Sequence, residues 1–316
     1  MSEIRKAATR DGYGRALVDL GNQYSNMVVL DADLAKATKT IEFKKAFPDR
    51  FIDCGIAECN MMGVAAGLAS IDKLPFASTF AIFATGRAFE QIRNSIAYPK
   101  LNVKVCATHA GISVGEDGAS HQAIEDIALM RTIPGMVVIN PSDEIEAYAA
   151  TLAAAKYEGP VYIRFGRSAL PVFNTSETYK FEIGKGICLA EGEDVTIIAT
   201  GLMVSEALNA AEELKNHNIS AKVINIHTLK PLDKDIILQA ARTTKGIVTC
   251  EEHNVIGGLF SAVSETLSYE GISTKILPVA VMDIFGRSGP AEELLNLYGL
   301  TSEAIVNKAL HLLHKI

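Results

Sequence analysis

The amino-acid sequence predicts an α/β fold with two domains, each a mostly parallel sheet flanked by helices. Two observations support this prediction. Short, continuously apolar runs alternate with longer amphipathic segments, a pattern typical of buried parallel strands connected by helices. The chain has 316 residues, of which 48% are hydrophobic, so it can bury two cores at roughly 100–200 residues per domain.

The first half of the chain contains six strand candidates separated by helix-patterned stretches. The clearest helix is 143–157 (DEIEAYAATLAAAKY), because the sequence Pro-Ser-Asp at its start supplies a favourable N-cap. The strand candidates are 26–33, 50–57, 74–81, 102–110, 136–142 and 159–166. We assign residues 1–170 to this first domain.

Prolines, glycines and polar residues interrupt the alternation between residues 168 and 194. This composition is typical of a linker followed by an irregular first strand, and we assign 171–190 to the linker and 191–316 to the second domain. The alternation then resumes, with one helix beginning at PLDKDIILQAAR. The strand candidates of the second half are 194–201, 219–229, 246–253 and 273–283.

Charge and composition exclude several classes of protein. The formal net charge is −7 and no basic run occurs, so nucleic acid and anionic membranes are not expected partners. The five cysteines lack a C-x-x-C pair, which is typical of free thiols in a reducing cytosol. No segment has the apolar stretch of a signal peptide or the roughly 18 apolar residues of a membrane span. We therefore expect a soluble, cytoplasmic protein.

Polar residues of unusual kind follow the strand candidates of the first half. The sequences LDAD, IAE, STF and ATHAG each end one of these strands. Parallel sheets bind their ligands at the carboxyl ends of the strands. We therefore expect a functional site at this edge of the first sheet.

Glu58 stands between the strand candidate 50–57 and a helix rich in small residues. One interpretation is a helix N-terminal acid, stabilised by roughly 0.3–1 kcal/mol through the helix dipole. The other interpretation follows from the small residues, which allow a second helix to approach closely at a subunit contact. An acid at the edge of that contact would be buried and would need a hydrogen-bonding partner. These small residues are Gly63, Ala65, Ala66, Gly67 and Ala69.

Phe80 and Phe83 lie three residues apart where a strand gives way to a helix, so their side chains share one face. Two phenylalanines in this position belong either to the core or to a surface on which a ligand stacks. Spacing alone leaves both interpretations open.

The segment 108–126 (THAGISVGEDGASHQAIED) concentrates titratable side chains in a glycine-rich loop. A zinc site would need four ligands, and a calcium loop would need more alternating oxygen ligands than this loop supplies. We therefore favour a site for a polar substrate over a solvated surface loop. The titratable residues are His109, Glu116, Asp117 and His121.

Arg10, Arg164 and Arg167 lie near the ends of predicted elements. An arginine in such a position either binds a phosphate through its planar fork or forms a surface salt bridge. In the second half, the segments EEHNVIGG (251–258) and GRSGP (286–290) form turns, for which we favour a structural or subunit-contact role.

Taken together and in order, these motifs resemble transketolase. The sequences FIDCGIAECNMMGVAAGLA, LPFASTFAIFATGRAFEQIRNSIAY, THAGISVGEDGASHQAIEDIALMRTIPGM and YIRFGRS resemble its pyrimidine-binding domain. The sequences VINIHTLKPLD, CEEHNVIGG and FGRSGP resemble its C-terminal domain. The resemblance covers essentially the whole chain.

The resemblance implies a thiamine diphosphate site and a role for each matching residue. Glu58 would hydrogen-bond the ring nitrogen of the cofactor's aminopyrimidine, and Phe80 and Phe83 would form its aromatic wall, with Phe83 the stronger stacking candidate. The residues matching the sugar-binding positions are Asp117 and His121 at the hydroxyls and His109, Arg10 and Arg167 at the phosphate end. One departure is that Ala37, followed by Thr38, stands where many transketolases have a phosphate-contacting serine. Either Thr38 substitutes for that serine or the substrate differs at this end.

The resemblance also implies a partner chain. The family holds the diphosphate through Mg²⁺ bound by a G-D-G motif in an N-terminal domain, and this sequence contains only GEDG at 115–118. We therefore expect the C-terminal subunit of a split transketolase, in a heterotetramer whose N-terminal subunit binds Mg²⁺. A truncated piece of a full-length enzyme is the alternative.

The implied reaction transfers a two-carbon glycolaldehyde unit from a ketose phosphate to an aldose phosphate, as in the pentose phosphate pathway. Alternatives are a split transketolase for apulose phosphate or sulfofructose, an enzyme like 1-deoxyxylulose-phosphate synthase, and a non-catalytic homologue. Retention of Glu58, Phe83, Asp117 and both loop histidines argues against the last of these.

Overall fold

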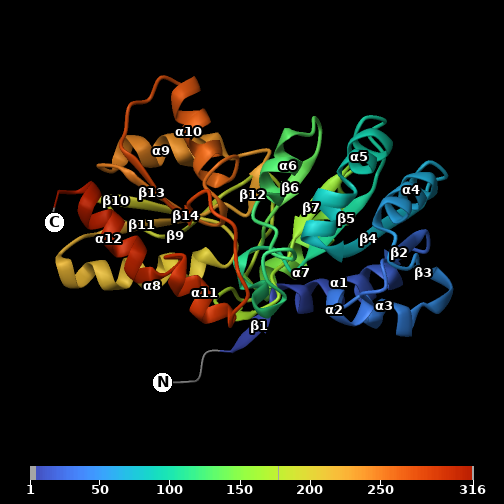
Figure 1. The fold of residues 1–316 in the computed structure, drawn as a ribbon. Helices are drawn as coiled ribbons and strands as arrows, with labels where there is room; N and C mark the ends of the chain where they lie inside the picture. The colour runs from blue at the N-terminus through green and yellow to red at the C-terminus, as the bar shows by residue number, and fades with distance from the viewer. Residues whose placement is uncertain (1–4, 177, 315–316) are drawn as a thin grey trace.

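Two sheets organise the chain in the computed structural model, which describes residues 5–176 and 178–314 (Figure 1). Within these residues the first sheet has seven strands in the order β12-β6-β7-β5-β4-β2-β3, all parallel to their neighbours except β12. Its strands are β2 (Met27–Asp31), β3 (Phe51–Asp53), β4 (Leu74–Phe80), β5 (Lys104–Thr108), β6 (Val137–Ile139), β7 (Val161–Arg164) and β12 (Thr228–Lys230). All six strands expected in the first half are present.

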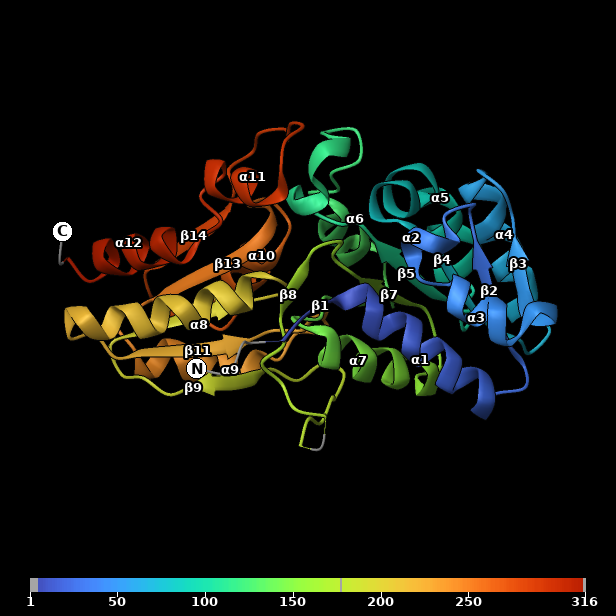
Figure 2. The same ribbon diagram turned by 90° about the horizontal axis from the view of Figure 1, so that it is seen from below.

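Helices cover both faces of this sheet. On one face α1 and α7 pack side by side (Figure 2) and bury apolar residues that include Tyr13, Leu17 and Ala150. The Asp143 side chain accepts a hydrogen bond from the Glu146 amide (2.9 Å), so the expected N-cap of α7 is confirmed. The helices are α1 (Thr9–Gln23), α2 (Ala35–Thr38), α3 (Ile41–Ala46), α4 (Glu58–Ala69), α5 (Phe89–Gln91), α6 (Asp126–Thr132) and α7 (Glu144–Lys156), with the short turns η1 (Pro48–Arg50), η2 (Phe83–Arg87), η3 (Ile92–Ala97) and η4 (Ile112–Asp117).

The second sheet has the order β14-β13-β10-β11-β9 in the described residues, and only β9 runs antiparallel to its neighbour. The expected fold class is therefore confirmed. The strands are β9 (Ile187–Ala190), β10 (Val195–Ala199), β11 (Ala221–Asn225), β13 (Ile247–Asn254) and β14 (Ile276–Val281). The helical elements are α8 (Met203–Leu214), η5 (Lys215–His217), α9 (Lys234–Thr243), α10 (Leu259–Tyr269), α11 (Ala291–Leu297) and α12 (Ser302–Leu312).

The two halves exchange structure at their junction. The apolar run 219–229, expected as one strand, divides into β11 in the second sheet and β12, which pairs with β6 at the edge of the first. β1 (Lys6–Ala8) and β8 (Ala169–Pro171) also pair there, antiparallel. An apolar run indicates burial but not which sheet provides it, so the sequence pattern did not reveal this division.

None of the helices formed by the described residues is long and apolar enough to cross a membrane.

Candidate active site

Glu58 is a buried carboxylate at the first residue of α4, just beyond the carboxyl end of β3. Only 2% of the residue is exposed. Arg87 Nη1 lies 2.8 Å from Glu58 Oε2, and the Arg87 side chain is half exposed. Both the helix N-terminus and this arginine stabilise the negative charge, so the carboxylate has the partner that its burial requires.

The small residues of α4 do not all face the core. Ala65 and Ala66 are buried, whereas Gly63 and Gly67 are exposed, and a Cβ added to either glycine would meet nothing within 4 Å. This chain therefore leaves one face of α4 uncovered, and the subunit contact expected there stays a prediction.

Arg87 connects Glu58 to the aromatic residues, although it is not among the residues predicted from the sequence. Its Cζ lies 4.4 Å from the centroid of the Phe83 ring, in a cation–π arrangement. Phe83 and Arg87 begin and end η2, a π-helical turn of the kind that often marks a functional site. Their separation of four residues was the available signal, since residues so spaced lie on one helix face.

Phe80 and Phe83 form one wall together with two histidines. The two phenylalanine rings are nearly parallel (14°) with centroids 6.1 Å apart, and His109 stacks on Phe80 at 3.9 Å. His121 meets the Phe83 ring edge-on at 5.3 Å. Phe80 is buried and Phe83 half-buried, so Phe83 presents the more accessible ring.

His109 is a neutral ring in this site. Burial is the main cause that lowers its pKa to about 3, followed by the nearby charges of Arg10, Arg167 and His121. Its Nε2 lies 3.4 Å from Arg10 Nη1, which can only donate, so Nε2 accepts and Nδ1 carries the proton shared with Thr108 Oγ1 (2.9 Å). Its backbone φ of 56° is unusual for a non-glycine residue, a feature that often occurs at functional sites.

The arginines predicted for the phosphate end lie close to His109. Arg10 Nη1 donates to the Ala37 carbonyl (2.8 Å), and Arg10 Nε is buried without a partner among the described residues. Arg167 donates to the Val114 carbonyl and to Glu116 Oε2, the latter at 2.9 Å. The fold therefore brings Arg10 and Arg167 close to His109, and the two arginines supply the positive charge. Their role at a phosphate stays a prediction.

Thr38 is not positioned to replace the missing serine hydroxyl. It is fully buried, and its Oγ1 donates to Asp31 Oδ2 (2.6 Å), which also accepts from Thr40 Oγ1 (2.8 Å). Burial raises the pKa of Asp31 to about 6, and these hydrogen bonds oppose that rise. The Thr38 hydroxyl is thus committed to Asp31.

Asp117 and His121 belong to the loop that follows β5. Asp117 is exposed at the end of η4, and His121 is half-buried against Phe83. His121 Nδ1 lies 3.0 Å from Ser120 Oγ. Of the two, only His121 contacts the aromatic wall.

These groups define what the site can bind. A buried carboxylate beside an aromatic ring suits a planar heterocycle that shares a proton through a ring nitrogen. Two arginines suit an anionic group a short distance away. Among the described residues, no group of three or more His, Cys, Asp or Glu side chains is placed to hold a metal ion.

Comparison with known proteins identifies the family. Residues 5–172 match the profile described as "Transketolase, pyrimidine binding domain", and residues 184–305 match "Transketolase, C-terminal domain". The chain belongs to the transketolase family. Within it, the chain matches the C-terminal section of the split form, which confirms the resemblance stated from the sequence.

Three relatives illustrate this match. A putative transketolase C-terminal section from Methanocaldococcus jannaschii is 52% identical over 97% of this chain and 96% of its own length. A 6-deoxy-6-sulfo-D-fructose transketolase subunit from a Clostridium species is 44% identical over 95% of this chain and 92% of its own length. A solved structure described as a split gene transketolase, inactive beta4 tetramer, is 52% identical with a TM-score of 0.90, covering 98% of this chain and 99% of that one.

Proposed function

We propose that this chain is one subunit of a transketolase that transfers a two-carbon ketol unit from a ketose phosphate to an aldose phosphate. One observation supports this most directly. A single guanidinium, that of Arg87, contacts both the buried Glu58 carboxylate and the Phe83 ring. The acid and the aromatic surface that a thiamine-type pyrimidine requires therefore lie at one place.

The residues present fit thiamine diphosphate. Glu58 would hold its pyrimidine through a ring nitrogen, and Phe83, backed by Phe80, would stack on the ring. When bound, the cofactor supplies a nucleophilic carbon that can attack a ketose carbonyl. The diphosphate and its Mg²⁺ would be held by a partner subunit.

Glu58 would act by holding a proton at its carboxylate. Arg87 occupies Oε2, which leaves Oε1 to share a proton with a bound ring nitrogen. Because the carboxylate is shielded from water, the hydrogen bond between Glu58 and the ring nitrogen would be stronger than in solution.

The remaining residues would hold the sugar. Asp117 and His121 would bind hydroxyl groups, and Arg10, Arg167 and neutral His109 would bind the terminal anion. Arg167 Nη1 lies 2.9 Å from Glu116 Oε2. Glu116 would therefore have to release Arg167 before the arginine could make a bidentate contact with the sugar's anionic group.

A partner follows from the domains present. The chain carries the pyrimidine-binding and C-terminal domains, so the diphosphate-binding domain would come from an N-terminal transketolase subunit, in a cytoplasmic heterotetramer of two subunits each. The relative described as an inactive beta4 tetramer supports the view that this section requires its partner.

A sulfonated ketose is a second candidate substrate. The Thr38 hydroxyl donates to Asp31 and Ala37 has only a methyl side chain, so neither offers a hydroxyl donor at the anion end. One relative is described as a 6-deoxy-6-sulfo-D-fructose transketolase subunit. A sulfonate carries one charge and needs fewer donors than a phosphate dianion. Comparing kcat/KM for the two ketoses separates these candidates.

The test is co-expression with the N-terminal section from the same genome, followed by assay of two-carbon transfer from xylulose 5-phosphate to ribose 5-phosphate. We expect the complex to be active, the isolated chain inactive, and Glu58→Gln to lose at least the roughly 10²–10⁴-fold typical of acid–base groups. Glu42→Gln, which removes a half-exposed acid paired with Lys45 on α3, is the control. Full activity in Glu58→Gln would refute the proposal.

A further inference from the structure

The loop that carries Asp117 and His121 is anchored by the other half of the chain. We call residues 111–121 the substrate loop. Glu252, near the end of β13, directs its carboxylate at this loop: Oε1 accepts a hydrogen bond from the Ser113 amide at 2.6 Å. A Cβ on Gly111 would lie 2.2 Å from the Glu252 carboxyl carbon, so the loop backbone packs directly against the acid.

Glu252 is itself firmly held. Only 3% of the residue is exposed. Arg164 Nη2 donates to the Glu252 carbonyl (2.8 Å), and Arg164 Nη1 lies 4.0 Å from Glu252 Oε2. Arg164 is oriented in turn by Asp126, whose Oδ2 accepts from Arg164 Nε (2.8 Å) and from the Tyr162 hydroxyl (2.6 Å). The carboxylate therefore has little freedom to follow a moving loop.

A second contact from the same half supports the far side of the substrate loop. Ser288 Oγ donates to the Glu116 carbonyl at 2.6 Å. The Gln122 side-chain amide donates to the carbonyls of Arg287 (2.9 Å) and Ile112 (3.1 Å). The loop thus lies between β13 and the turn at 286–289, both outside the domain that contains Glu58.

We propose that Glu252 is a positioning residue that fixes the substrate loop through Ser113 and thereby sets where Asp117 and His121 stand relative to Phe83. Its effect on the sugar rests on the function proposed above. Glu252 does not contact that site itself; it acts through the loop backbone. This assigns the C-terminal domain a part in substrate binding.

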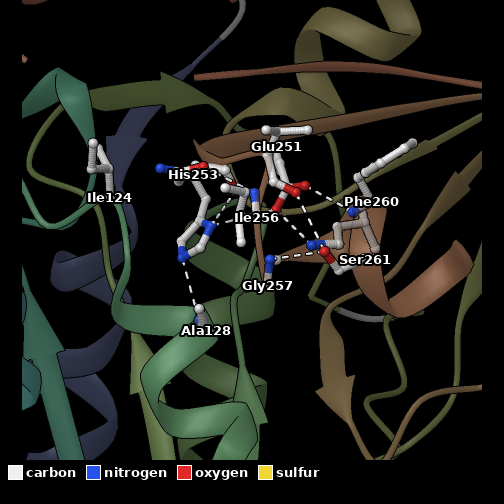
Figure 3. Close-up of polar contacts among 12 residues, drawn as sticks. Ile124, Ala128, Glu251, His253, Ile256, Gly257, Phe260 and Ser261 are labelled. Carbon is white, nitrogen blue, oxygen red and sulfur yellow. Dashed lines mark hydrogen bonds and ion pairs between the residues drawn. The ribbon is translucent and has the colours of Figure 1, made fainter. Parts of the chain in front are cut away.

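Glu251 provides a matched control, because it is the adjacent residue on the same strand, is also buried, and directs its carboxylate at Phe260 (Figure 3). Its carboxylate accepts hydrogen bonds from the amides of Leu259 (2.6 Å) and Phe260 (2.8 Å) at the start of α10. Removing either acid disturbs a buried hydrogen bond to backbone, and only the removal of Glu252 should reach the substrate loop.

The experiment is hydrogen–deuterium exchange on the full chain carrying Glu252→Ala, Glu252→Gln or Glu251→Gln. We expect amides of residues 111–121 to exchange roughly tenfold faster or more in Glu252→Ala, which loses the buried carboxyl acceptor of the Ser113 amide. Glu252→Gln should show a smaller increase, because its carbonyl oxygen can still accept. Glu251→Gln should accelerate exchange near the start of α10 and leave the loop unchanged.

Loop exchange equal to wild type in Glu252→Ala would overturn the proposal, as would equal loop acceleration in both Gln variants. If Glu252→Ala does not fold, the comparison of the two Gln variants decides. In the active complex, we expect Glu252→Gln to raise KM for the ketose severalfold with little change in kcat, and Glu251→Gln to change neither. A wild-type complex without transfer activity would refute the proposed function, whereas the exchange result would still decide the role of Glu252.

Discussion

The Arg87 guanidinium lies 2.8 Å from the Glu58 carboxylate, and this contact joins residues 29 positions apart in the chain. It pairs a nearly inaccessible acid with a half-exposed cation. Such a pair can open on the exposed side, because water can solvate the arginine while the carboxylate stays in place. Exchange of the arginine for another hydrogen-bond donor is therefore physically accessible at this site.

Replacing Arg87 with alanine should destabilise the chain by about 1–3 kcal/mol, because a buried carboxylate is left without its cation and the cation itself is partly screened by water. Urea denaturation of the isolated chain measures this. The double variant Glu58→Gln/Arg87→Ala should be more stable than Arg87→Ala alone. Equal stability of Arg87→Ala and wild type would show that the ion pair is not needed to hold Glu58.

Phe80 and Phe83 should respond differently to truncation. Phe80→Ala removes a buried ring that packs on His109, and we expect a loss of about 3–5 kcal/mol. Phe83→Ala removes a half-buried ring and should cost less stability, yet weaken thiamine diphosphate binding by the assembled complex more than tenfold. Thermal denaturation and calorimetric titration measure the two effects. The reverse order of stability loss would contradict the packing described here.

The lowered pKa of His109 predicts an acid-dependent loss of stability. The folded chain holds this ring neutral to about pH 3, whereas the unfolded chain protonates it near 6.5, so the unfolded state binds more protons between these values. Stability conferred by neutral His109 is therefore lost as pH falls below 6.5. Relative to His109→Gln, wild type should lose about 2 kcal/mol between pH 7 and pH 5. Parallel unfolding curves of the two proteins over this range would contradict the prediction.

Thr38→Val should act on stability and not on substrate choice. The hydroxyl donates to buried Asp31, so its loss should cost about 1–3 kcal/mol and raise the pKa of Asp31 further. Because this hydroxyl faces Asp31, the ratio of kcat/KM for a phosphorylated and a sulfonated ketose should stay unchanged. Ala37→Ser, which adds a hydroxyl next to the Arg10 contact, is the comparison variant. A changed ratio in Thr38→Val would show that Thr38 contacts the substrate.

The sequence predicted the features that depend on local pattern. Every strand expected in the first half is present, and Asp143 caps α7. Both features could be predicted because apolar runs and N-caps depend on residues that are neighbours in the sequence. Glu58 could be singled out because an acid in an apolar segment is locally unusual. The contacts of Arg87 with Glu58 and of Glu252 with Ser113 could not be predicted, because they join residues 29 and 139 positions apart. The commitment of Thr38 to Asp31 likewise depends on how the chain folds after β2.

The antiparallel pairing of β12 with β6 has a consequence for dissecting this protein. Residues 228–230 supply the last strand of a sheet otherwise built from the first half. A fragment that stops at the apparent domain boundary would present β6 as a bare, apolar edge, which is a template for pairing with other molecules. The second half of the chain thus completes the sheet of the first half. Expression of the first half alone should therefore yield aggregates.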